Sequence, residues 1–188
     1  YCDLPDSIRR RAARTVMELV FDHLVTWLAP ILCFTAEEAW IARYGEGVES
    51  VHLKTFPTVP GTWKDDALAQ KWAGIRSIRR VVTGAMELAR NEKKIGAPLQ
   101  AHPHVYLTKE HKKILEGIDL AQISISSSLT LIEEAPPQNA FVLPDVEGVG
   151  VVINLAKGRK CERCWQVLPE VGEHKDHPDL CGRCHDAV

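Results

Sequence analysis

Four of the six cysteines in this 188-residue chain form two pairs with the spacing of metal ligands. Cys161 and Cys164 make one Cys-x2-Cys pair, Cys181 and Cys184 make the other, and residues 165–180 separate them. Two cysteines three positions apart on a tight turn can present both sulfurs to one ion, and two such turns supply four thiolates in a tetrahedron. The spacing predicts one Zn²⁺ ion. Because four protein ligands fill its coordination sphere, the predicted role of the ion is structural.

Other interpretations of these cysteines are open at this stage. The four could form disulfides or remain buried thiols, although no signal peptide opens the chain and disulfides are typical of secreted proteins. Cys2 and Cys33 have no paired spacing and are interpreted as buried apolar or incidental residues. A histidine close in sequence could also replace one cysteine as a ligand; the candidates are His174, His177 and His185.

The segment that carries these cysteines, residues 156–188, has few other residues to bury. Its apolar residues, with one just before it, are Leu155, Trp165, Val167, Leu168, Val171 and Leu180. Folding of the segment is therefore expected to depend on zinc, which supplies about 10–16 kcal/mol of apparent binding energy in small structural sites. Basic residues surround the cysteines and could offset the charge of a zinc–tetrathiolate or face an external polyanion; they are Lys157, Arg159, Lys160, Arg163 and Arg183.

The elements that precede this segment divide by hydrophobic period. Apolar residues recur at helical spacing over residues 5–29 and 64–94. Between them, Thr35 begins a capping-box sequence that predicts a helix from Thr35 to Tyr44, with Gly45 closing it. Short connections favour an antiparallel helical bundle over residues 1–98.

The period changes over residues 99–155. Val105–Leu107, Phe141–Leu143 and Val149–Ile153 predict strands, and Thr108 predicts the cap of a short helix. Alternation from Ile123 through Leu131 predicts a further half-buried strand region. The predicted chain is mainly α: a helical bundle (1–98), a small α+β module (99–155) and a four-cysteine zinc finger (156–188).

Charge is uneven along a chain whose formal net charge is -2. Residues 71–94 hold seven basic against two acidic side chains, and residues 7–14 hold four arginines and no acid. Such segments are either solvated helix faces or phosphate-binding surfaces, and two of them beside a basic finger favour phosphate binding. The candidate RNA-binding residues are Arg76, Arg79, Arg80, Arg90, Lys93, Lys94, Arg163, Trp165 and Arg183. Trp165 could stack on a base or belong to the core.

No run of 18 apolar residues predicts a membrane span, and no signal peptide is recognisable, so the expected location is cytoplasmic. The opening Tyr1-Cys2-Asp3 suggests a segment of a longer protein.

Several motifs carry a resemblance to a known family. Cys161–Trp165 (CERCW), Val171-Gly172 and Leu180–Cys184 (LCGRC) resemble the C-terminal zinc finger of bacterial isoleucyl-tRNA synthetases. Upstream, four segments resemble the anticodon-binding helical domain of class I synthetases for aliphatic amino acids: Leu28–Leu32 (LAPIL), Phe34–Trp40 (FTAEEAW), Ser50–Pro57 (SVHLKTFP) and Arg90–Gly96 (RNEKKIG).

The resemblance implies a C-terminal fragment of a synthetase that binds isoleucine tRNA and carries no catalytic residue of its own. The family's HIGH and KMSKS signatures are absent from the chain, so ATP and Mg²⁺ are expected only in the parent catalytic domain, which acts in cis in a monomer. Two alternatives stay open. A similar finger occurs in formamidopyrimidine-type DNA glycosylases, and the finger could be a purely structural brace for the bundle.

Overall fold

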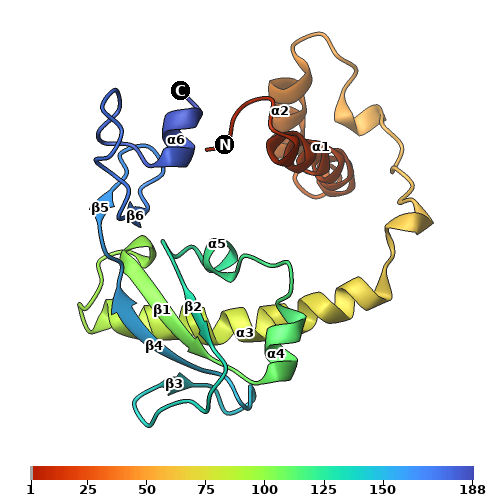
Figure 1. Ribbon diagram of the computed structural model, residues 1–188. Coiled ribbons are helices and arrows are strands. Elements are labelled where there is room, and N and C mark those ends of the chain that lie inside the picture. Colours follow the sequence, from red (N-terminus) through yellow and green to blue (C-terminus); the bar gives the residue numbers. More distant parts are fainter. Residues whose placement is uncertain (1) are drawn as a thin grey trace. The chain divides into compact units, whose positions relative to one another are not determined.

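A computed structural model describes residues 2–188; Tyr1 lies outside the described residues. The chain divides into two compact units, one of residues 3–64 and one of residues 65–188. Figure 1 shows the elements, which within the described residues comprise six α-helices, six short strands and three 3-10 turns. No helix within residues 2–188 is both long enough and apolar enough to cross a membrane.

The first unit consists of α1 (Ile8–Leu28), α2 (Cys33–Tyr44) and the 3-10 turns Val51–Leu53 and Gly61–Trp63. Its small core joins Val25 of α1 and Ala29, the residue after α1, to Ala36 of α2 and to Val51. Gly45 closes α2 as predicted, with a positive φ of 95° and its N–H donating to a carbonyl in the last turn. The predicted capping box is wrong, because α2 begins at Cys33 and places Thr35 inside its first turn.

The second unit is organised around α3 (Asp66–Asn91), which the Asp65 side chain caps by accepting the N–H of Leu68. Beside it lies a four-stranded sheet formed by β1 (Ala101–Tyr106), β2 (Thr130–Ile132), β3 (Phe141–Val142) and β4 (Gly150–Leu155). The strand order is β2-β1-β4-β3; β1 and β2 are parallel, and the other pairs are antiparallel. Figure 1 shows α3 running along the sheet, where its buried stripe meets alternate residues of β1 and β4.

The helical bundle predicted for residues 1–98 is not confirmed. Along the chain, the boundary between the compact units falls between Lys64 and Asp65, and α3 packs on the sheet of the second unit. The predicted helix after Thr108 is confirmed as α4 (Lys109–Ile114), with the Thr108 hydroxyl accepting the N–H of His111. The strand predicted at Ile123 and Ile125 is wrong: this stretch forms α5 (Leu120–Ser124), and Ile125 ends it in the left-handed region at φ 60°.

The cysteine-rich end of the chain forms the smallest elements. β5 (Arg159–Lys160) and β6 (Val167–Leu168) pair as an antiparallel hairpin, and α6 (Gly182–Asp186) follows near the C-terminus. The buried residues here are Cys161, Val171, Cys181 and Cys184. The core of this segment therefore consists mainly of cysteines: three of the four with paired spacing are buried in it.

Candidate metal centre and nucleic-acid interface

The four cysteines predicted as zinc ligands come together in space. The sulfurs of Cys161, Cys164, Cys181 and Cys184 all lie within 4.8 Å of one another, and the Cys164 and Cys181 sulfurs are 3.7 Å apart. A zinc–sulfur bond of about 2.3 Å gives a tetrahedron with edges of about 3.8 Å. The sulfur cluster therefore fits one zinc ion, and it is complete without His174, His177 or His185.

Local backbone hydrogen bonds explain how the first pair turns inward. The Cys161 N–H donates to the Gln166 carbonyl across the β5–β6 turn at 2.8 Å, and the Trp165 N–H donates to the Cys161 carbonyl at 2.8 Å. Trp165 adopts a left-handed conformation with φ 66°, which closes the turn after Cys164. These bonds bring two sulfurs three residues apart to the same side of the hairpin.

The second pair is positioned by the start of α6. Cys181 is the N-cap residue of α6, and its carbonyl accepts the His185 N–H at 2.8 Å. The Cys181 N–H lies 3.4 Å from the Cys161 sulfur, so a backbone donor from one pair points at a ligand of the other. The Glu170 carboxylate accepts the Gly182 N–H at 3.0 Å and ties the intervening loop to the same turn.

The electrostatics of the sulfurs match a metal donor set. Burial raises the pKa of the Cys161 thiol, but the backbone N–H groups of Cys164, Cys181 and Arg163 bond its sulfur and bring the pKa down to about 6. Burial raises the pKa of the Cys164 and Cys181 thiols, and neighbouring cysteine sulfurs add to that rise. The Cys161 thiolate thus forms readily, while the Cys164 and Cys181 thiols need a bound cation to share the charge of their thiolates.

Two arginines contribute positive charge at the sulfurs. The Arg163 guanidinium lies 3.5 Å from the Cys184 sulfur, and this hydrogen bond raises the pKa of Arg163 above its ordinary value. Burial lowers the pKa of Arg183, but the hydrogen bond and charge of Cys164, with the charges of Cys2 and Cys184, together raise the pKa above its ordinary value. Arg183 also donates to the Gln166 side chain at 3.3 Å. Local charge compensation is therefore one role of these two residues.

Trp165 belongs to the surface of the finger. Its side chain is 61% exposed, and the Lys160 ammonium lies 5.3 Å from the centre of its ring. The sequence left open whether Trp165 stacks on RNA or is core, and its exposure excludes the core. An exposed indole beside a lysine is suited to stack on a nucleobase whose phosphate meets the ammonium.

The predicted basic residues of α3, and those just after its end, differ in what they contact. The Arg79 side chain donates to the Ile123 carbonyl at 2.6 Å, and Arg80 forms an ion pair with Asp145. Arg90 pairs with Glu87 at 2.6 Å and Lys94 pairs with Glu92 at 2.7 Å. Exposed Arg76 and Lys93 have no ion pair or side-chain hydrogen bond to any residue among 2–188.

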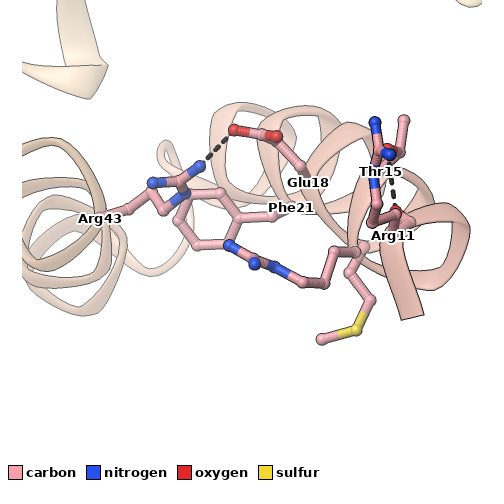
Figure 2. A pocket seen from close by; sticks show the side chains of 7 residues that line it. Arg11, Thr15, Glu18, Phe21 and Arg43 are labelled. Atoms are coloured by element: carbon pink, nitrogen blue, oxygen red, sulfur yellow. Dashed lines mark hydrogen bonds and ion pairs between the residues drawn. The ribbon is translucent and has the colours of Figure 1, made fainter. Parts of the chain in front are cut away.

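A basic hollow on the first unit was not among the predicted sites. It lies between α1 and α2, and arginines of both helices line it (Figure 2). The signal that could have found it was the run of four arginines within residues 7–14. Sequence alone does not show that Arg43 of α2 joins two of them.

Two families of known protein domains match this chain. A profile described as the anticodon-binding domain of tRNA ligase matches residues 1–105, and one described as the zinc finger found in FPG and IleRS matches residues 158–187. The first match covers more than half of the chain. The chain therefore belongs to the family of anticodon-binding domains of tRNA ligases.

Individual relatives that the chain resembles are isoleucine–tRNA ligases. The chain is 48% identical over 184 residues to the isoleucine–tRNA ligase of Brucella abortus (strain 2308), and 47% identical over 184 residues to that of Agrobacterium fabrum. Each alignment covers 97% of this chain and 19% of the relative. The ligase of Ruegeria pomeroyi is 50% identical over 190 residues, with 100% of this chain and 19% of the relative covered. The chain thus spans about a fifth of the length of these relatives.

Proposed function

We propose that this chain is the tRNA-binding C-terminal region of an isoleucine–tRNA ligase, and that it positions isoleucine tRNA for aminoacylation by catalytic domains elsewhere in the same polypeptide. The observation that carries the proposal is the pairing of the anticodon-binding match over residues 1–105 with a four-cysteine centre that displays Trp165 on its surface. The proposal includes one structural zinc, ATP and Mg²⁺ bound only by the catalytic region, and a monomeric cytoplasmic enzyme.

Within this proposal, the chain's own residues bind and orient rather than react. Closed coordination by four cysteines gives zinc a structural role and fixes the finger's turns. Exposed Trp165 offers a stacking surface, and Lys160 beside it offers a phosphate contact. Arg76 of α3 and Lys93, two residues after its end, are the candidates best placed for phosphates, because they make no competing intramolecular ion pair within residues 2–188.

Aminoacylation has two steps that separate this role from catalysis. Formation of isoleucyl-adenylate requires only ATP and isoleucine, whereas transfer requires the acceptor end of the tRNA to reach the active site. A displacement of about 1 Å at a reacting centre can cost roughly 100-fold in rate. Substituting Cys181→Ser in the full ligase is therefore expected to lower tRNA charging by about 100-fold, with pyrophosphate exchange near the wild-type rate.

The matched control is Cys33→Ser, which changes an exposed cysteine outside the finger and should leave both rates unchanged. Equal loss of charging and pyrophosphate exchange in Cys181→Ser would show that the finger supports the whole enzyme's fold and would contradict the proposal.

A structural brace is the second candidate function. It is favoured by the Val167 N–H, which donates at 2.7 Å to the buried Ser127 hydroxyl and so joins the finger to the loop that precedes β2. Substituting Trp165→Ala separates the two functions, because loss of base stacking weakens RNA binding by about 1–3 kcal/mol. A brace predicts unchanged tRNA affinity, since an exposed side chain contributes little to the fold.

A further inference from the structure

The hollow between α1 and α2 combines a ligand-sized volume with positive charge. Its volume is about 470 Å³, within the range of about 300–1,000 Å³ typical of small-molecule sites. Its lining residues are Arg11, Arg14, Thr15, Met17, Glu18, Phe21 and Arg43. α1 has 21 residues and α2 has 12, and Arg43 near the end of α2 meets α1 at Glu18. Arg11 and Arg14 therefore lie on the part of α1 that extends past α2.

Two of the three arginines in the hollow carry uncompensated charge. Glu18 forms an ion pair with Arg43, which Figure 2 shows as a bridge from α1 to α2. Arg11 and Arg14 are exposed and form no ion pair or side-chain hydrogen bond with any residue among 2–188. The single carboxylate in the lining is thus already engaged, and two guanidinium groups are left to bind an anion.

This hollow is distinct from the exposed apolar face of the same helix. Val16, Val20 and Leu24 recur every four residues and are 59%, 48% and 46% exposed. Arg11 and Arg14 recur at a spacing of three on a different side of the helix, the side that continues into buried Val25. The ligand of the hollow therefore carries an anionic group, whatever covers the apolar face.

We propose that the hollow binds one nucleotide of the tRNA, with its phosphodiester on Arg11 and Arg14 and its apolar surface against Phe21. Guanidinium groups bind phosphate oxygens in a bidentate manner, and aromatic rings accept nucleobases on their faces. The site lies inside the segment that matches anticodon-binding domains. This inference rests on the proposed function and adds a third RNA contact, separate from the finger and α3.

The test uses the full ligase chain and a fluorescent RNA stem–loop of the isoleucine anticodon arm, with affinity measured by anisotropy across a salt series. Replacing Arg11→Ala and Arg14→Ala together removes two phosphate contacts. Each contact contributes roughly 0.7–0.9 to the slope of log K against log salt, so the slope should fall by about 1.4–1.8. Both residues are exposed on a helix, and alanine is a good helix former, so α1 should remain folded.

The matched control replaces Arg9→Ala and Arg10→Ala, which removes the same charge from the same helix. These side chains interact with Asp3 instead, Arg9 through an ion pair at 3.3 Å and Arg10 through the Asp3 carbonyl at 2.9 Å. The control should keep the wild-type slope. Equal slope losses in both double variants would show a general field effect and overturn the site, as would no loss in either. If the wild-type chain binds no RNA at all, the proposed function itself fails.

Discussion

The zinc finger (residues 156–188) and the sheet module (residues 65–155) of the second unit are stabilised in opposite ways. The sheet module buries sixteen apolar residues in one cluster, with Ile75, Ile78 and Val82 of α3 at its centre. The finger buries four residues, and three of these are cysteines of the sulfur cluster. Apolar burial is sufficient to specify the first, whereas we expect the second to need a metal ion because too little apolar surface leaves water when it folds.

The largest expected effect follows from metal removal. Chelation of zinc, or Cys161→Ser, should unfold the finger and leave the sheet module folded, since about 10–16 kcal/mol of apparent metal-binding energy is lost from the finger alone. Hydrogen exchange should show loss of protection at the Trp165 and His185 amides, and retained protection in β1 and β4. Loss of all helical circular dichroism would contradict the comparison, because the two regions would then be one cooperative unit.

A substitution in the core of the sheet module should destabilise that module and leave the zinc finger folded. Ile78 is fully buried, so Ile78→Ala should destabilise the sheet module by about 2–5 kcal/mol through lost burial and a residual cavity. Exposed Arg76→Ala, two residues earlier on α3, is the control and should change stability by less than about 0.5 kcal/mol. Thermal denaturation of the sheet module measures the stability of both variants. Zinc content of the folded protein should stay at the wild-type level, and its loss in Ile78→Ala would show that the finger depends on the sheet's core.

Features set by local chemistry were predictable from sequence. The sulfur cluster follows from the spacing of its cysteines, and the Thr108 cap and Gly45 terminus follow from side-chain and backbone preferences at single positions. The partner of α3 was not predictable, because an apolar stripe at Ile75 and Ile78 shows that one face is buried and not what covers it. Short connections favoured another helix, and the structure has a sheet there.

Alternation and charge were weaker guides. Ile123 and Ile125 alternate like strand residues, yet the Asp119 side chain caps α5 by accepting the Gln122 N–H. Among the basic residues of α3, sequence could not separate Arg79, which donates to a backbone carbonyl, from Arg76, which has no ion pair or side-chain hydrogen bond within residues 2–188. The two differ in whether a distant segment of the chain packs against that position of α3, which is set by the tertiary structure.

The smallest expected effect concerns the link between the two regions. Ser127 is buried, its hydroxyl donates to the Leu99 carbonyl at 2.5 Å, and it accepts the Val167 N–H at 2.7 Å. Ser127→Ala leaves the partly buried Val167 N–H and Leu99 carbonyl without this partner, and an unsatisfied polar group away from water costs about 1–3 kcal/mol.

Because Val167 lies on β6 beside the first cysteine pair, the substitution should speed exchange of the Val167 amide and the release of zinc to a chelator. Ser128→Ala is the matched control, since the Ser128 hydroxyl bonds His102 within the sheet module and should leave zinc release unchanged. Equal release rates for Ser127→Ala and wild type would show that the finger is held by its metal alone. The stability of the finger would then depend on its metal ion and not on its contact with the sheet module.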